Sequence, residues 1–366
     1  MKIKKKLLPV WLITLIDILL IASYVIGFYG IYYLSPRELA SSNIQTVQAQ
    51  VAAESTETSG TDTTGTDTSD IEVTDADSSK DTDATDADSS TDTETLSVTS
   101  DDLKAKFAEY FTDDVVSTSD SYSSSGISIT VDQYTTGSGE DTVTYYVADI
   151  YLADITSLQS GFAEDTYGVG YTDTVLDMDE SLNAILAMNG DYYGNGGDGV
   201  VIRNGEVYRS STSDSDVCVL YYDGIMKTYS AEEFDVDQAI AEGAWQAWCF
   251  GPELLDDTGS SMTEFVSDGH VSSINPRSAL GYYEPGHYCM VVVDGRQSGY
   301  SAGMTLTELS SLLEELGCTS AYNMDGGKSS SMTFDDAEVN QPTDGGREVS
   351  DCILIKEQSG DMSRGD

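Results

Sequence analysis

A low-complexity tract over residues 54–100 divides this 366-residue chain into unlike parts. The tract consists almost wholly of Ser, Thr, Asp, Glu, Ala and Gly, and the sequence TDADSS occurs in it twice, at 74–79 and 85–90. Such a composition cannot bury enough apolar surface to offset the entropy lost on ordering, so we predict a disordered, charge-extended stalk over residues 41–100. A folded domain is expected only after it, over residues 101–358, with a short tail at 359–366.

The segment before the stalk, residues 1–40, has the features of a membrane anchor. Residues 7–34 are apolar apart from Asp17 and follow a cluster of lysines. A helix of this length exceeds a hydrocarbon core of roughly 30 Å, and the basic end is expected to stay in the cytoplasm. We therefore predict an uncleaved signal-anchor, a single pass through the cell membrane and an extracellular C-terminal domain. A cleaved signal peptide is the alternative, although its apolar region normally has only about 7–15 residues.

The charge of the chain excludes two classes of partner. The formal charge is −47, to which residues 1–40 contribute +3, residues 41–94 contribute −13 and the remaining residues contribute −37. Binding to nucleic acid requires clustered Lys and Arg against the phosphates, so no nucleic-acid partner is expected. The folded part is not expected to adhere to an anionic bilayer for the same reason. An anionic small substrate stays compatible with the sequence if a few well-placed cations bind it.

The domain after the stalk is predicted to be α+β, with a single mixed sheet, more strand than helix and a few packed helices. Segments rich in Val, Ile and Tyr predict strands at 126–131, 143–151, 184–188, 199–202, 217–222, 288–294 and 352–355. The clearest helix is expected over 306–316, where Thr305 and Glu308 match a capping box and Gly317 a stop signal. With a strand-like segment at 320–324 after it, this helix predicts a βαβ unit.

Cysteine and histidine usage gives no sign of a metal centre. The five cysteines are odd in number and widely spaced, which argues against a disulfide framework or a zinc site. Three of them, Cys218, Cys289 and Cys352, lie in apolar strand-like segments and are expected to be buried. We expect no required cofactor. A calcium ion held by scattered oxygens is compatible with so acidic a chain but is not predicted.

Five segments depart from simple core patterning because polar groups accompany an apolar run. They are MNGDYYG at 188–194, NPRSALG at 275–281, VVVDGR at 291–296, AYNMDGGKSSSM at 321–332 and GGREVS at 345–350. In the first segment, Asn189 and Asp191 are placed to contact sugar hydroxyls, with Tyr192 as a stacking wall. A simple Asn-Gly turn explains this segment equally well.

Isolated cations in the later segments suit an anionic ligand. Basic residues are scarce in so acidic a domain, and Arg277 and Arg347 are two of the few. A guanidinium can hold a phosphate through two parallel hydrogen bonds. Asp294 ends a predicted buried strand, which is where open α/β sheets usually place ligands.

The segment at 321–332 is the most informative of the five. Asn323 and Asp325 alternate with apolar residues and therefore share a face of the strand. Gly326 and Gly327 then allow a bend whose amides can point at an anion. Lys328 and Ser329 add further donors there.

In this order, the segments resemble the phosphodiester glycosidase family over about residues 184–355. The shared blocks are NGDYYG, GVVIRNGEVYRSS, FGPELL, NPRSALGY, VVVDGRQSGYSAGMTLTELSSLLEELGC, AYNMDGGKSSSM and REVSDCILI. The resemblance implies hydrolysis of the sugar–phosphate bond in a sugar-1-phosphodiester. Polar groups of the family's motifs correspond to Asn189, Arg277, Asp294, Asp325, Ser329 and Arg347. Two positions depart from the family, which usually has Gly where this chain has Lys328 and commonly Gly where it has Asp191.

These considerations predict a set of site residues. The expected catalytic residues are Asp325, Asp294 and Arg277. The expected substrate-binding residues are Asn189, Asp191, Tyr192, Asn323, Gly326, Gly327, Lys328, Ser329 and Arg347. Arg277, with Arg347 or Lys328 and the amides of 326–329, is expected to bind the phosphate. Asp325, and secondarily Asp294, is expected to stabilise an oxocarbenium-like sugar or to activate water.

Two functions from different classes fit this sequence. The first is an extracytoplasmic hydrolase acting on a sugar-1-phosphodiester, in the metabolism of a cell-envelope glycopolymer or exopolysaccharide. The alternative is a non-catalytic anchored envelope protein that binds an anionic glycopolymer. Release of free sugar from a panel of sugar-phosphodiesters distinguishes them.

Overall fold

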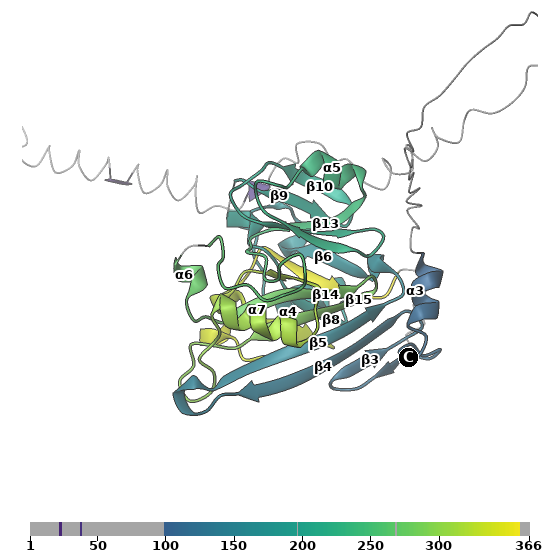
Figure 1. Cartoon of the computed structure of the whole chain (residues 1–366), viewed down its shortest axis with the longest axis horizontal. Helices are drawn as coiled ribbons and strands as arrows, with labels where there is room; N and C mark the ends of the chain where they lie inside the picture. The colour runs from purple at the N-terminus through teal and green to yellow at the C-terminus, as the bar shows by residue number, and fades with distance from the viewer. Residues whose placement is uncertain (1–21, 24–36, 39–98, 196, 268, 359–366) are drawn as a thin grey trace, which may run out of the picture.

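The computed structural model describes residues 22–23, 37–38, 99–195, 197–267 and 269–358 (Figure 1). The predicted membrane helix over 7–34 lies outside the described residues except for 22–23, and the predicted stalk lies outside them except for its last two residues. The tail at 359–366 also lies outside them. Within the described part of the chain, no helix is both long enough and apolar enough to span a bilayer.

The first of three large sheets has seven strands in the order β16-β14-β15-β5-β4-β3-β2. Its strands are β2 (Val116–Ser117), β3 (Ser121–Ser123), β4 (Ile127–Thr136), β5 (Val143–Leu152), β14 (Arg277–Glu284), β15 (His287–Val293) and β16 (Ser320–Asn323). β4 and β5 form the long hairpin at the lower edge of Figure 1. The predicted strands at 143–151 and 288–294 are confirmed within one residue at either end.

The second and third sheets have five strands each. The second follows the order β10-β9-β13-β11-β12, with β9 (Val200–Arg203), β10 (Glu206–Ser210), β11 (Val217–Tyr221), β12 (Met226–Tyr229) and β13 (Ala244–Cys249). The third follows β18-β17-β8-β19-β6, with β6 (Leu158–Phe162), β8 (Leu186–Asn189), β17 (Met332–Phe334), β18 (Ala337–Glu338) and β19 (Asp351–Ile355). A small pair joins β1 (Arg37–Glu38) to β7 (Gly168–Val169).

The prediction of a single mixed sheet is wrong, because all strand pairs among the described residues are antiparallel. The predicted βαβ unit does exist in a different form. β15 and β16 point the same way and are joined through a helix, but β14 lies between them and is antiparallel to both. β15 and β16 are therefore not paired with each other but each with the antiparallel β14. The strand–helix–strand connection itself follows the order that the sequence predicted.

The helices are α3 (Ser100–Lys106), α4 (Val175–Leu182), α5 (Val236–Ala241), α6 (Gly269–Ser272) and α7 (Leu306–Glu315). The prediction for α7 is confirmed, including the capping box in which Thr305 and Glu308 bond to each other's backbone amides. With strands in the majority and few helices, the domain is α+β as predicted.

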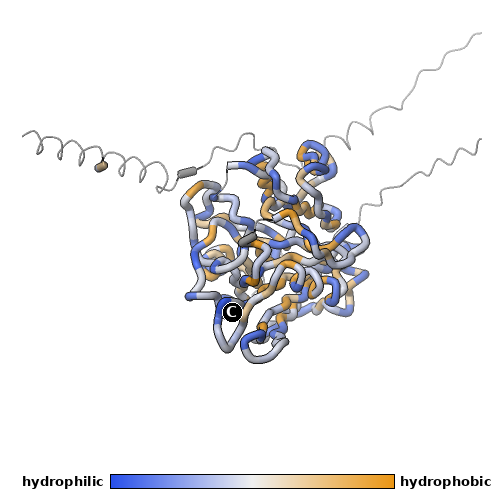
Figure 2. The backbone as a smooth tube through the Cα atoms, turned by 60° about the vertical axis from the view of Figure 1, so that its left-hand side comes forward, coloured by the Kyte–Doolittle hydropathy of each residue, from blue (hydrophilic) through white to orange (hydrophobic). Residues whose placement is uncertain are grey.

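The largest hydrophobic cluster joins the three sheets, since it contains Ile150 and Met290 from the first, Trp248 from the second and Met188 and Ile353 from the third. The opposite face of the first sheet is covered by the apolar side of α7. In Figure 2 the hydrophobic stretches (orange) run through the inner strands, whereas peripheral loops are mostly hydrophilic (blue). Removal of this apolar surface from water holds the sheets in place and so fixes the strand ends that carry the polar motifs.

Candidate active site

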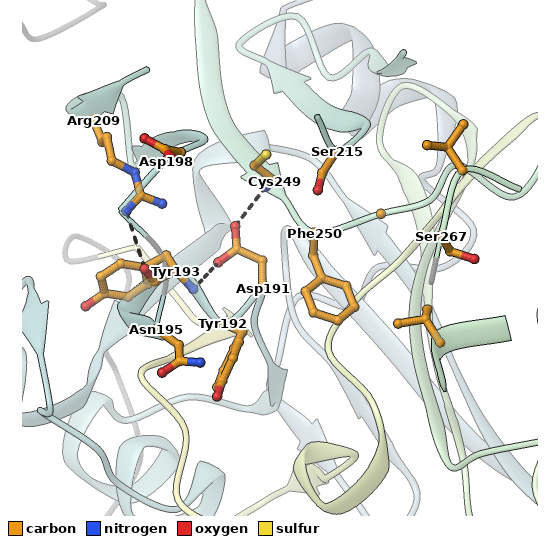
Figure 3. Close-up of a pocket in the computed structure, with 13 residues that line it drawn as sticks. Asp191, Tyr192, Tyr193, Asn195, Asp198, Arg209, Ser215, Cys249, Phe250 and Ser267 are labelled. Atoms are coloured by element: carbon orange, nitrogen blue, oxygen red, sulfur yellow. Dashed lines mark hydrogen bonds between the residues drawn. The ribbon is translucent and has the colours of Figure 1, made fainter. Parts of the chain in front are cut away.

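Two adjoining pockets lie where the ends of the three sheets meet. The Arg277 pocket has a volume of about 160 Å³ and is lined by Phe250, Val271, Asn275, Pro276, Arg277, Arg296, Asn323, Asp325, Gly326 and Gly327. The Tyr192 pocket has a volume of about 340 Å³ (Figure 3). It is lined by Asp191, Tyr192, Tyr193, Asn195, Asp198, Arg209, Ser215, Cys249, Phe250, Gly251, Val266, Ser267 and Val271. The two pockets adjoin because Phe250 and Val271 line both.

Asp325 follows β16, and its carboxylate contacts two other predicted site residues, Ser329 and Arg347. Its Oδ2 accepts hydrogen bonds from Ser329 Oγ and from Arg347 Nη2, both at 2.5 Å. Arg347 also donates from Nε to Ser329 Oγ at 2.6 Å, so the three side chains form a closed triangle. Burial raises the pKa of Asp325, while the bonds from Ser329 and the charge of Arg347 oppose this rise. Arg347 lies over the ring of Tyr192, 4.9 Å from its centroid.

Arg277 begins β14 and is 2% exposed. Its guanidinium donates to two backbone carbonyls, from Nε to Met304 at 2.9 Å and from Nη2 to Ser273 at 2.5 Å. Among the described residues no carboxylate lies within 4 Å of it. Burial, and secondarily the charge of Arg296, lowers the pKa of Arg277 to about 10, so it stays charged at neutral pH.

Arg296 is a second cation in this pocket and was not among the predicted site residues. It follows β15 in the left-handed conformation, at φ 58°, and donates from Nη2 to Asn275 Oδ1 at 2.5 Å. Like Arg277, it has no carboxylate within 4 Å among the residues that the structure describes. The sequence signal that could have identified Arg296 was its position directly after the Asp-Gly pair that follows a buried strand.

The Gly326-Gly327 bend has a different role from the predicted anion nest. The Gly327 amide donates to the Pro276 carbonyl at 3.0 Å and the Ser329 amide to the Gly326 carbonyl at 3.3 Å, so these amides do not point at a ligand. A Cβ on Gly326 would lie 2.8 Å from the Pro276 carbonyl oxygen, and one on Gly327 would lie 3.3 Å from Arg296 Nη1. The glycines therefore make room for the β14 backbone and for the guanidinium of Arg296.

Asn323 presents an unused acceptor in the Arg277 pocket. Its Nδ2 donates to the Gly251 carbonyl at 2.8 Å, and its side chain is buried. No donor among the described residues reaches its Oδ1. A buried acceptor without a partner is costly, and this atom has almost no exposed surface through which a ligand could reach it.

Asn189 and Asp294 lie behind the pockets and line neither. Asn189 is fully buried and donates to the Asp325 carbonyl at 2.7 Å, while its Oδ1 accepts from Ser278 Oγ at 2.7 Å. Asp294 accepts from Asn340 Nδ2 at 2.8 Å, from the Gln341 amide at 3.0 Å and from the Tyr300 hydroxyl at 2.8 Å. The structure thus places both as supports of site loops and leaves neither side chain available to a ligand in these pockets.

Asp191 lines the Tyr192 pocket, but its carboxylate is bound by the protein. Oδ1 lies 2.8 Å from Arg203 Nη2, and Oδ2 accepts from the Cys249 amide at 2.9 Å. Arg203 also pairs with Asp351 at 2.9 Å, and all three side chains are buried. The acid that departs from the family pattern is therefore part of a buried group in which one arginine is shared by two carboxylates, and Arg203 offsets part of the negative charge beside the pocket.

Lys328 lies outside both pockets. Its Nζ is 2.8 Å from Asp344 Oδ2, in an exposed ion pair. Tyr192, in contrast, lines the pocket as predicted and is 36% exposed. Within the described residues there is no group of three or more His, Cys, Asp or Glu side chains that could hold a metal ion.

Comparisons with known proteins indicate the family that this domain resembles. Residues 182–356, just under half of the chain, match the family model described as phosphodiester glycosidase. A curated relative, the SPbeta prophage-derived uncharacterized protein YomE of Bacillus subtilis (strain 168), is 30% identical over 196 residues. That alignment covers 52% of this chain and 30% of YomE, so the chain spans less than a third of the relative's length.

Among solved structures, the catalytic domain of zebrafish N-acetylglucosamine-1-phosphodiester alpha-N-acetylglucosaminidase, auto-inhibited by its pro-peptide, matches with a TM-score of 0.51 and 17% identity. The match covers 63% of this chain and 84% of that chain, and at this identity it shows a shared fold. The family model and the fold point to the same assignment as the motifs. Over residues 182–356 this chain resembles the phosphodiester glycosidase family.

Proposed function

We propose that the domain hydrolyses the bond between a sugar and phosphate in a sugar-1-phosphodiester, releasing free sugar and a phosphomonoester. The observation that carries this proposal is the convergence of Asp325, Arg277 and Arg296 on one pocket within a phosphodiester glycosidase domain. The printed name of the zebrafish structure describes an enzyme for this class of bond, which supports the proposal.

The phosphate occupies the Arg277 pocket in this proposal. Arg277 and Arg296 line it without carboxylate partners within 4 Å among the described residues. Guanidinium groups bind phosphate oxygens through charge-assisted hydrogen bonds, which are stronger than neutral ones. Arg347, which the sequence analysis also considered for this task, is held by Asp325 instead.

The sugar occupies the adjoining Tyr192 pocket. Tyr192 and Phe250 offer apolar ring faces there, while Asn195 and Ser215 offer polar groups (Figure 3). Apolar walls with a few placed polar groups are the usual lining of a small-molecule site.

Asp325 is the acid that acts on the sugar. It is the one acid among the residues that line the Arg277 pocket. Ordinary glycosidases use two carboxyl groups because the leaving group has to be protonated. A phosphate leaves as a stable anion and makes little demand for a general acid, so one carboxylate can stabilise the positive sugar or activate water. Arg347 and Ser329 hold Asp325 in place for this task.

The proposed setting is the outer side of the cell membrane, with the predicted anchor and stalk giving the domain reach to a cell-envelope glycopolymer or exopolysaccharide. The sequence of residues 1–100 supports this setting. No cofactor is needed in the proposed reaction, because the cations that bind the phosphate belong to the chain. Turnover that survives dialysis against EDTA would support this, and loss of turnover restored by calcium would contradict it.

The decisive experiment measures free sugar after incubation of the purified full-length protein with UDP-N-acetylglucosamine and other sugar-1-phosphodiesters. We expect release by the wild type and its loss in Asp325→Asn. Asp237→Asn is the matched control, because Asp237 is exposed on α5 and lines neither pocket. Near-normal turnover by Asp325→Asn would overturn the assignment. Binding of a glycopolymer without any sugar release would favour the non-catalytic alternative.

A further inference from the structure

The two arginines of the Arg277 pocket give it more positive charge than a phosphodiester can neutralise. The charged groups that line the pocket are Arg277, Arg296 and Asp325. Asp325 is already paired with Arg347 at 2.5 Å. With that pair counted as neutral, the two arginines leave a charge of about +2 toward the pocket, in a chain of net charge −47.

Two exposed acids act on these arginines at longer range. Glu308 keeps its charge while it caps α7, but it is exposed and forms no ion pair within 4 Å of Arg277, so solvent weakens its attraction for Arg277. Asp344 acts on Arg296, but it is exposed and pairs with Lys328 at 2.8 Å. These acids therefore reduce the local excess of positive charge without removing it.

The substrate and the product of the proposed reaction differ in charge. A phosphodiester carries one negative charge, whereas a phosphomonoester carries up to two because its second pKa is about 6. A pocket with two uncompensated guanidinium groups matches the dianion better than the monoanion.

We propose that the Arg277 pocket is a binding site for dianionic phosphomonoesters, and that the released phosphomonoester inhibits the enzyme. The inhibition part rests on the proposed function, whereas the binding site itself does not. A consequence is that a reaction of the phosphomonoesterase class, which consumes the product, would relieve the inhibition and sustain turnover. Arg296 is the more informative residue for a test, because it is exposed and its replacement leaves the core intact.

The test compares ethyl phosphate with diethyl phosphate, a matched monoester and diester, by calorimetric titration of the full-length protein. We expect ethyl phosphate to bind at least about tenfold more tightly at pH 7.5, which is about 1.4 kcal/mol. We expect Arg296→Gln to remove about that factor, and Lys104→Gln, at an exposed lysine on α3 that lines neither pocket, to leave it unchanged. Equal affinities for the two esters, or no effect of Arg296→Gln in a variant with a native circular dichroism spectrum, would overturn the proposal.

The dependence on pH separates the ligand's charge from that of the protein. Between pH 7.5 and pH 5 ethyl phosphate gains a proton, so its affinity should fall by about tenfold, whereas sulfate stays a dianion and should keep its affinity. A parallel loss for sulfate would contradict the proposal, because it would place the titration on the protein. If ethyl phosphate binds through Arg296 but no sugar is released from any substrate, the site stands and the proposed hydrolysis fails. If sugar is released but ethyl phosphate does not inhibit, the proposed hydrolysis stands and the proposed inhibition by the phosphomonoester fails.

Discussion

Asn189 donates a hydrogen bond from Nδ2 to the backbone carbonyl of Asp325 at 2.7 Å, and so ties the end of β8 to the loop that carries the proposed catalytic carboxylate. The two residues are 136 positions apart in the chain; Asn189 ends β8 of the third sheet, whereas Asp325 follows β16 of the first. The asparagine also accepts from Ser278 at the start of β14. One buried amide therefore sets the position of Asp325 relative to two strands.

Replacing Asn189 with Ala should reduce both stability and turnover. The substitution leaves the Asp325 carbonyl and the Ser278 hydroxyl without partners in a buried site, which costs about 1–3 kcal/mol. Because Asn189 lines neither pocket, we expect kcat to fall by at least about tenfold with little change in KM. Urea denaturation and steady-state kinetics measure the two effects. Asn195→Ala is the control, since this exposed pocket residue should change KM alone; a rise in KM without loss of kcat in Asn189→Ala would contradict the positioning role.

Arg347→Gln should shift the acidic limb of the pH–rate profile to higher pH. Burial already raises the pKa of Asp325, and Arg347 opposes that rise, so its loss raises this pKa further. Asp325 acts as a carboxylate in the proposed reaction, and a higher pKa means that it is protonated, and inactive, at pH values where the wild type still works. The profile of kcat/KM against pH measures the shift, with Lys104→Gln on the exposed side of α3 as the unchanged control. A shift in the opposite direction would show that the protonated form of Asp325 is the active one.

The buried group of Asp191, Arg203 and Asp351 predicts a dependence of stability on pH. Burial, together with the charge of Asp191, raises the pKa of Asp351 to about 7 against the pull of Arg203. An acid with a raised pKa binds its proton more tightly in the folded than in the unfolded chain. Stability from this group is therefore greatest at low pH and falls as pH rises from about 4 to about 7.

Asp351→Asn should remove this dependence, because Arg203 then pairs with Asp191 alone. Urea denaturation at pH 5 and pH 8 compares the free energies of unfolding of the variant and the wild type. The exposed Asp344→Asn serves as control. An unaltered difference between the two pH values in Asp351→Asn would assign the dependence to other groups.

Cys249 should be the first cysteine to react with iodoacetamide. It is half-buried and lines the Tyr192 pocket, whereas the other four cysteines are buried. Burial raises the pKa of the Cys249 thiol, so labelling should be slow at pH 7 and faster at pH 9. Peptide mass spectrometry follows the modification, and a substrate in the pocket should protect against it. Earlier labelling of Cys218 or Cys289 would contradict the burial pattern.

Local signals predicted much of the fold, because they depend on neighbours in the chain. The capping box of α7 and the apolar runs of β5 and β15 are properties of short segments, and they appear where expected. The insertion of β14 between β15 and β16 depends on pairing between distant segments, which the hydrophobic periodicity of a single segment does not predict. The mixed sheet was therefore predicted wrongly, while the α+β class was predicted correctly.

The site was predictable to a similar degree. Asp325, Ser329 and Arg347 do meet, and Tyr192 lies beside them. The role of Asp294 depends on Asn340, 46 positions away in the chain, and no local pattern indicates that its carboxylate is bound there. Arg296 was missed for a related reason, because its closeness to Gly327 arises only when two strand ends are brought together.

The two pockets are built from different sheets. Arg277 begins β14 of the first sheet, and Arg296 and Asp325 follow its neighbours β15 and β16. Much of the Tyr192 pocket comes from the second sheet, including Arg209 on β10 and Cys249 on β13. Changes in the loops of the second sheet can therefore exchange one sugar preference for another while the phosphate-binding strand ends stay in register. In this architecture, new specificity can evolve without the chemistry being reinvented.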